Sequence, residues 1–167
     1  MSPAVVLIGA PGAGKSTVGA LLAEALETEH IDTDSLVEQR LGRSVADIFI
    51  EHGEPIFRDA EREAVAQALT VDNAVVSLGG GAVLDLATQS VLVGHPVVWL
   101  RVSLASAAAR VGMNQSRPLL LQNPRATLAT LLDERTPIYQ SLAMFTVDTD
   151  EADVAHVVDS VQTWLTS

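Results

Sequence analysis

The chain has 167 residues and a net charge of −11, and 48% of its residues are hydrophobic, which predicts a single packed domain over residues 1–167. The absence of cysteine excludes disulfides and thiolate zinc sites. The acidic charge argues against nucleic-acid binding, and no apolar run reaches the roughly 18 residues of a membrane span. We expect a monomer in the cytoplasm, without a signal peptide because no basic stretch precedes the first apolar run.

Short apolar runs alternate with helical patterns along the chain. The runs cover residues 4–8, 30–32, 74–78, 96–102 and 144–147. This alternation predicts an α/β fold, a three-layer sandwich in which a five-stranded parallel sheet carries helices on both faces. Ligands bind beyond the carboxyl ends of the strands in such sheets. The residues that follow each run are therefore the candidates for a functional site.

The first run leads into residues 9–16, which read Gly-Ala-Pro-Gly-Ala-Gly-Lys-Ser. This is the P-loop pattern G-x-x-x-x-G-K-S, and a helical pattern follows it. Backbone N–H groups and the start of the helix would surround the phosphates of ATP. Lys15 would reach the β- and γ-phosphates and Ser16 would bind Mg²⁺. The alternative is a glycine-rich turn that happens to precede a helix; the nucleotide-binding prediction covers Gly12, Ala13, Gly14, Lys15, Ser16 and Thr17.

Two aspartates, Asp32 and Asp34, follow the second run. Asp32 is placed to hold Mg²⁺ or its water shell. Asp34, expected one pleat further along the strand, could reach an acceptor hydroxyl as a base or as an orienting acceptor. The alternative is that Asp34 caps the next helix, and capping and catalysis are compatible.

The middle of the chain carries charged and aromatic residues on two helical patterns, separated by Gly53-Glu54-Pro55. Arg58 and Glu61 are three apart and share a helix face. Helical spacing alone favours ordinary core packing for Phe49 and Phe57. After the third run, the glycines at 79, 80 and 81 would let a ligand approach the backbone closely, although a flexible turn is the simpler alternative.

Three arginines in the second half of the chain are candidate site residues. Arg110 lies on a helical pattern, and residues 112–124 then show little periodicity. We predict that this segment is a mobile lid that excludes water, with Arg117 adding charge at the γ-phosphate. Arg135 lies near the end of a predicted helix over residues 125–139, where a cation also favours the helix dipole.

Together these motifs resemble the shikimate kinases, small P-loop enzymes similar to nucleoside monophosphate kinases, over about residues 4–165. The resemblance implies that the chain uses ATP and Mg²⁺ to phosphorylate the 3-hydroxyl of shikimate, in the pathway to chorismate and the aromatic amino acids. It rests on the P-loop, Asp32-Thr33-Asp34, Phe57-Arg58 with Glu61, Ser-Leu-Gly-Gly-Gly-Ala at 77–82, Arg117-Pro118-Leu119 and Arg-Thr-Pro-Ile-Tyr at 135–139.

The family pattern implies a role for each matching residue. Asp34 would hold the ring hydroxyls and orient or deprotonate the acceptor. Arg58 and Arg135 would grip the carboxylate, and Glu61 would support Arg58. Arg110 would lie against the adenine. The acceptor site would also take in the helices over about residues 34–62, with Phe49 and Phe57 as walls of the ring and Gly79, Gly80 and Gly81 in close backbone contact.

One segment departs from the family pattern, in which a basic residue and a proline often help to enclose adenine. Residues 148–154 here read Asp-Thr-Asp-Glu-Ala-Asp-Val, with neither. We expect ATP to bind through its phosphates and Mg²⁺, with weaker selectivity for the base.

Other functions share parts of this pattern. A gluconate kinase would have the same fold and P-loop and a carboxylated polyol as acceptor. A nucleoside monophosphate kinase would need more cations than this chain offers. A nucleotide-binding regulator would bind ATP and Mg²⁺ but leave Asp34, Arg58 and Arg135 without a shared ligand.

Overall fold

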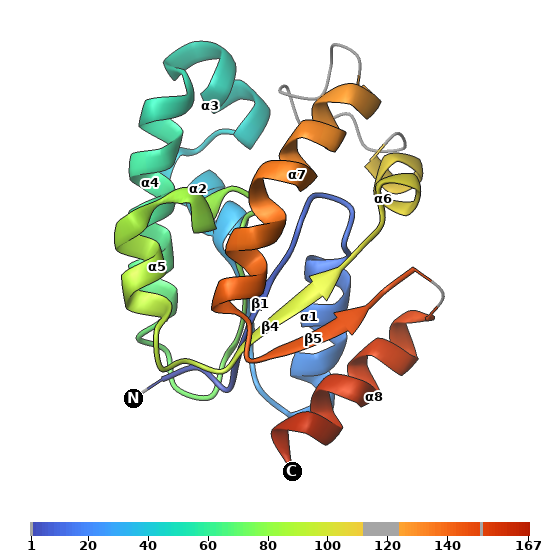
Figure 1. Ribbon diagram of the computed structural model, residues 1–167. Helices are drawn as coiled ribbons and strands as arrows, with labels where there is room; N and C mark the ends of the chain where they lie inside the picture. Colours follow the sequence, from blue (N-terminus) through green and yellow to red (C-terminus); the bar gives the residue numbers. More distant parts are fainter. Residues whose placement is uncertain (1, 112–123, 151) are drawn as a thin grey trace.

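A computed structural model describes residues 2–111, 124–150 and 152–167. Its five strands form one parallel sheet in the order β2-β3-β1-β4-β5, which confirms the predicted α/β fold and each predicted strand (Figure 1). The strands are β1 Val5–Ile8, β2 His30–Asp32, β3 Val75–Ser77, β4 Val97–Arg101 and β5 Phe145–Asp148.

The central strand β1 shows why a strand of this sheet is an apolar run in the sequence. Val6 pairs with Val76 of β3 on one side and with Val97 of β4 on the other. Every residue of β1 is buried, because helices cover both faces of the sheet. The carboxyl ends of β1, β2 and β3 therefore lie side by side, and the segments that follow them meet at one edge.

Helices pack on both faces of this sheet (Figure 1). The helices α1 and α8 contact each other, and they pack on β3 and β5 respectively, on one face. On the opposite face, α7 contacts β4 and the 3₁₀ turn that precedes α5. The helices are α1 Lys15–Ala25, α2 Thr33–Leu41, α3 Val45–His52, α4 Glu54–Ala68, α5 Leu86–Leu92, α6 Leu104–Val111, α7 Pro124–Leu142 and α8 Val154–Leu165, with a 3₁₀ turn at Ala82–Leu84.

The helices α2, α3 and α4 form a group with a small core of its own. That core contains Val37, Ile48 and Phe57, and the half-buried Phe49 packs against it. Phe57 is 2% exposed, and its ring centroid lies 4.8 Å from that of Phe49. Burying a side chain of this size stabilises the fold by about 2–3 kcal/mol. This second core fixes α4, which carries Arg58.

Two expectations about the elements are corrected. Sequence reasoning did not anticipate α5, and it ended α7 at residue 139 although the helix continues to Leu142. The predicted lid, residues 112–124, lies outside the described residues except for Pro124. In the described part of the chain, no helix is both long and apolar enough to span a membrane.

Candidate active site

The P-loop connects β1 to α1 as the motif predicts. Gly14 has φ of 90° and forms the N-cap of α1, a left-handed conformation that glycine adopts without strain. A side chain at Gly9 would place its Cβ 2.7 Å from the carbonyl oxygen of Leu100, so the loop also packs tightly on β4. Lys15 is 8% exposed, and its ammonium donates to the carbonyls of Gly9 at 2.7 Å and Ala10 at 3.1 Å. The loop therefore holds its cation close to its own backbone.

Asp32 joins the P-loop helix to α2. Its Oδ2 accepts a hydrogen bond from the Ser16 hydroxyl at 2.5 Å, and its Oδ1 accepts one from the N–H of Ser35 at 3.2 Å. A hydroxyl and a carboxylate are oxygen ligands that suit Mg²⁺, which also takes phosphate oxygens and water. Within the described residues, no group of three or more acidic, histidine or cysteine side chains could hold a metal. The pair Ser16 and Asp32 thus fits Mg²⁺ that arrives with a nucleotide.

A cavity of about 200 Å³ extends from the P-loop to the end of β3. Its wall includes Lys15, Ser16, Asp32, Asp34 and Gly79, with Pro11, Gly12, Gly14, Thr17, Leu78 and Arg110. The cavity thus brings the residues predicted to bind phosphate close to Asp34. Ala13 of the same loop is buried.

Asp34 lies at this edge, but not where the sequence placed it. The helix α2 begins at Thr33, so Asp34 is in the first helical turn rather than one pleat further along a strand. Asp32 makes the helix cap, which corrects the alternative that Asp34 would do so. The buried Thr33 hydroxyl accepts a hydrogen bond from the N–H of Gly79 at 3.0 Å. This bond fixes the first turn of α2 against the end of β3.

Gly79 lets two carboxylates approach the backbone. A Cβ at this position would lie 2.6 Å from Asp34 Oδ1 and 2.8 Å from Glu61 Oε2, closer than real Cβ contacts. Glu61 is 3% exposed and accepts a hydrogen bond at 2.7 Å from Arg58. The absence of a side chain at 79 is therefore a packing requirement, and the flexible turn is not needed to explain this glycine.

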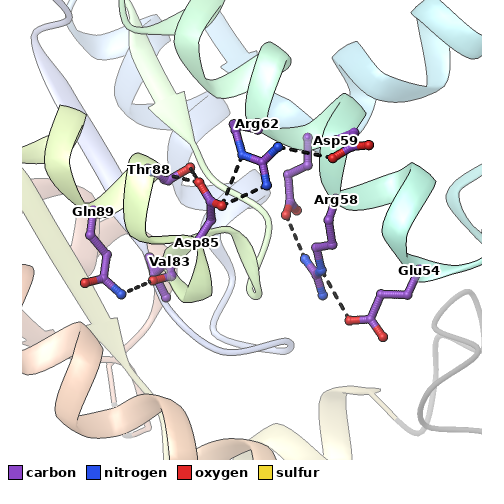
Figure 2. Close-up of polar contacts among 9 residues, drawn as sticks. Glu54, Arg58, Asp59, Arg62, Val83, Asp85, Thr88 and Gln89 are labelled. Carbon is purple, nitrogen blue, oxygen red and sulfur yellow. Dashed lines mark hydrogen bonds and ion pairs between the residues drawn. The ribbon is translucent and has the colours of Figure 1, made fainter.

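Gly81 likewise lets the Arg58 guanidinium approach the backbone. A Cβ there would lie 2.5 and 2.6 Å from the two terminal nitrogens of the guanidinium. Arg58 also donates through Nε to Glu54 at 3.3 Å (Figure 2). Burial opposes the charge, but Glu61 and Glu54 together raise the pKa of Arg58 above its ordinary value. The guanidinium is therefore a fixed cation held against bare backbone.

Arg135 approaches the remaining glycine from α7. Its Nη1 lies 3.5 Å from the Cβ that a residue at Gly80 would carry, and Arg135 is 4% exposed. Because α7 continues to Leu142, Arg135 is not in the last turn, and the interpretation as a cation at a helix end is wrong. Its Nε has no hydrogen-bond partner in the described part of the chain. An anion stabilises a buried cation, so Arg135 is a candidate to bind an anionic ligand.

Sequence reasoning gave no role to Tyr139, which lies one turn after Arg135 on α7. Its buried hydroxyl donates to the carbonyl of Gly80 at 2.6 Å, and its ring stacks on Trp99 at 6.0 Å. The spacing of four residues on one helix face was a usable signal. Nothing in the sequence pattern pointed to Thr33 as the partner of Gly79.

Arg110 connects the P-loop to the end of β5. It donates to the carbonyl of Gly12 at 2.9 Å and to that of Thr149 at 3.0 Å. It lines a second cavity of about 230 Å³ on the other side of the loop, together with Ala13, Gly14, Thr17, Val18, Thr149, Ala152, Val154 and Val157. This mostly apolar wall suits a flat heteroaromatic ring.

Asp148 and Asp150 of the departing segment 148–154 are engaged elsewhere. Asp148 accepts two hydrogen bonds from Arg101, at 2.8 and 2.6 Å, which lowers the pKa of its carboxyl despite the opposing effect of desolvation. Asp150 accepts one from the N–H of Ser103 at 2.9 Å. Neither lines the cavity beside Arg110.

The structure thus brings together most of the predicted site residues. Asp34, Glu61, Arg58 and Arg135 meet at the three glycines, and Lys15, Ser16 and Asp32 lie next to them. Phe49 and Phe57 belong to the core of the α2–α4 group. Arg117 lies outside the described residues.

Known proteins match this chain over nearly its whole length. A family model described as shikimate kinase matches residues 11–166. The shikimate kinase of Thermobifida fusca is 58% identical over 149 residues, which are 89% of this chain and 87% of that protein. A shikimate kinase from Acinetobacter baumannii, solved in complex with shikimate, has a TM-score of 0.94 at 30% identity and covers 99% of this chain and 93% of its own. A gluconokinase from Sinorhizobium meliloti, with a TM-score of 0.59 at 19% identity, covers 97% of this chain and 90% of its own and shares the fold alone.

Proposed function

Because the chain belongs to the shikimate kinase family and transfers the γ-phosphoryl group of ATP to the 3-hydroxyl of shikimate, we propose that the charged groups around the three glycines bind the acceptor. The observation that carries this proposal is the convergence of two carboxylates and two guanidiniums on glycines 79–81. A Cβ at Gly79 or Gly81 would lie less than 3.0 Å from these groups, and one at Gly80 would lie 3.5 Å from Arg135. A ring acid with several hydroxyls needs such a set of cations and acceptors.

We propose that Arg58 and Arg135 bind the carboxylate of shikimate. A guanidinium matches a carboxylate with two parallel N–H donors. Glu61 holds Arg58 in place through its 2.7 Å bond, whereas Arg135 is buried without such a bond at its Nε. Gly80 and Gly81 let the ligand approach the backbone. Asp34, which lies beside Gly79, binds the ring hydroxyls and orients or deprotonates the one that attacks.

Transfer of the phosphoryl group depends on position and on charge neutralisation. We propose that the backbone of Gly12, Ala13 and Gly14 surrounds the phosphates, next to Thr17, while Lys15 neutralises the β- and γ-phosphates. Ser16 and Asp32 would hold Mg²⁺, which when bound supplies further positive charge at the phosphates. Arg117 is the second cation that we propose for the γ-phosphate.

We further propose that the base of ATP occupies the cavity beside Arg110, whose guanidinium would stack on the ring. The rings of Phe49 and Phe57 remain candidates for the wall of the acceptor site; the half-buried Phe49 is the more accessible of the two. The chain is proposed to act as one catalytic domain, a monomer in the cytoplasm, with helices over about 34–62 shaping the acceptor site and residues 112–124 as a lid.

The experiment that tests the acceptor is release of ADP from Mg²⁺–ATP by the purified protein, with shikimate, with gluconate and with neither. Release that depends on shikimate is expected. Release with gluconate alone would contradict the roles of Arg58 and Arg135, because these would then serve an open-chain acid. Binding of ATP without acceptor-dependent release would support a nucleotide-binding regulator.

A further inference from the structure

The segment that follows the three glycines is bonded to α4 by a second arginine of that helix. Arg62 lies one turn after Arg58 and points toward Asp85, as Figure 2 shows. It donates to Asp85 Oδ1 through Nε at 3.1 Å and through Nη2 at 2.9 Å. Its Nη1 donates to Asp59 of the same helix at 3.1 Å. All three donor nitrogens of the guanidinium are thus used.

The two carboxylate oxygens of Asp85 accept hydrogen bonds from two different helices, α4 and α5. While Oδ1 accepts from Arg62, Oδ2 accepts from the N–H of Thr88 at 2.9 Å and from its hydroxyl at 3.1 Å, which caps α5 (Figure 2). The hydrogen bonds from Arg62 lower the pKa of Asp85 to about 2, although desolvation opposes them. The pair is therefore charged on both sides near neutral pH.

A short chain of hydrogen bonds connects Asp85 back to the glycines. The N–H of Leu84 donates to the carbonyl of Gly81 at 3.1 Å, and that of Asp85 donates to Ala82 at 3.3 Å, which makes a 3₁₀ turn. The Gln89 side chain donates to the carbonyl of Val83 at 2.7 Å. The backbone from 81 to 85 is thus internally braced, so a displacement of Asp85 moves Gly81.

The position of Gly81 relative to α4 matters because Arg58 of α4 lies against it. The Cβ that Gly81 lacks would lie 2.5 Å from the Arg58 guanidinium. Arg58 and Arg62 are consecutive turns of one helix, one in contact with Gly81 and the other bonded to Asp85. We propose that Arg62 and Asp85 are a positioning pair, which fixes the distance between the Arg58 guanidinium and the Gly81 backbone and so sets the affinity for the acceptor carboxylate. This inference rests on the proposed acceptor role of Arg58.

The test compares steady-state kinetics of Arg62→Gln and Asp85→Asn with the unchanged protein, varying shikimate and ATP separately. Asparagine can still cap α5, so Asp85→Asn removes the charge with little loss of the cap. We expect a rise of about threefold to tenfold in the KM for shikimate, with kcat and the KM for ATP within twofold. The double variant should be no worse than either single variant, because both remove the same bond. Arg62→Lys retains one charged donor and should restore part of the affinity.

The matched control is Asp59→Asn, which removes the other carboxylate that Arg62 contacts and leaves the bond to Asp85. It should leave all three kinetic constants unchanged. Equal effects of Asp59→Asn and Arg62→Gln would overturn the proposal, as would a loss confined to kcat. If Arg135→Lys weakens shikimate binding and Arg62→Gln does not, the acceptor site stands and the positioning role is wrong. If neither weakens it, the acceptor assignment fails as well.

Discussion

The phosphate side and the acceptor side of this site are built in different ways. On the phosphate side, one contiguous loop supplies the backbone, the cation Lys15 and the hydroxyl of Ser16, and the loop itself holds the cation at 2.7 Å from the Gly9 carbonyl. On the acceptor side, charges from α2, α4 and α7 converge on three glycines that have no side chains. The first region is local in sequence and the second is not.

This difference shows what a glycine contributes in each region. Gly14 of the P-loop is needed for its backbone angle, since φ is 90° and no atom lies within 4 Å of the Cβ it lacks. Gly79 is needed for space, because carboxylates from α2 and α4 occupy the place of its Cβ. The phosphate side should therefore fail when a single functional group is lost, and the acceptor side when space or position is lost.

The largest expected effect is that of Lys15→Ala on the phosphate side. Loss of the cation at the transferred group should lower kcat by about a hundredfold to a thousandfold. The KM for shikimate should change little, because the acceptor groups are untouched. Steady-state ADP release measures both constants. A kcat within a few-fold of the unchanged protein would remove Lys15 from the transfer step.

The second largest effect is expected for Gly79→Ala, which fills space on the acceptor side. The new Cβ would lie 2.6 Å from Asp34 Oδ1 and 2.8 Å from Glu61 Oε2, so one or both carboxylates must move. A misplacement of about 1 Å costs roughly a hundredfold in rate. We expect kcat/KM for shikimate to fall by about that factor while the KM for ATP is maintained.

Gly94→Ala is the control for this variant. Gly94 has φ of 90° with open space around its missing Cβ, and it lies between α5 and β4. Alanine there should cost about 1–2 kcal/mol of unfolding free energy through backbone strain and leave the kinetics unchanged. Equal kinetic losses in the two variants would mean that lowered stability, and not displaced carboxylates, explains Gly79→Ala.

The contrast between the regions also explains how much the sequence could predict. The P-loop, its strand and its helix were readable because eight adjacent residues fix the whole arrangement. The strands β1, β3 and β4 were predictable because burial on both faces makes each of them an apolar run. The less buried β2 and β5 were predictable from their place in the alternation of strands and helices. The convergence at glycines 79–81 could not be derived from spacing, because it depends on how α2, α4 and α7 pack; only the resemblance to a known family placed those residues together.

Errors in the prediction have the same origin. Asp34 was assigned to an extended strand end, but the cap made by Asp32 starts α2 at Thr33, one residue before Asp34. The helix α5 was missed because it has seven residues and exposes Leu86 and Val91, so it has no clear apolar face; the Asp85 cap and the bond to Arg62 define it instead. Both features depend on contacts that a residue pattern does not contain.

A smaller effect is expected for Arg135→Lys, which keeps the charge and removes the planar pair of donors. Lysine binds a carboxylate as a point charge, so about one charge-assisted hydrogen bond is lost. At about 1.5 kcal/mol for such a bond, the KM for shikimate should rise about tenfold. The kcat and the KM for ATP should stay within twofold. An unchanged KM for shikimate would contradict a carboxylate role for Arg135.

The smallest effect is expected from removing one hydroxyl on the acceptor side, that of Tyr139. Tyr139→Phe keeps the ring that stacks on Trp99 and removes only the donor to the carbonyl of Gly80, which lies at 2.6 Å. A buried carbonyl that loses its donor costs about 1–2 kcal/mol of unfolding free energy, which urea unfolding measures. Because the peptide after Gly80 then loses its orientation, the KM for shikimate should rise about threefold.

Ser141→Ala removes a hydroxyl from the exposed side of the same helix and should change neither the stability nor the KM for shikimate. A loss of stability in Tyr139→Phe without any change in that KM would mean that Gly80 needs its donor for folding and not for the acceptor.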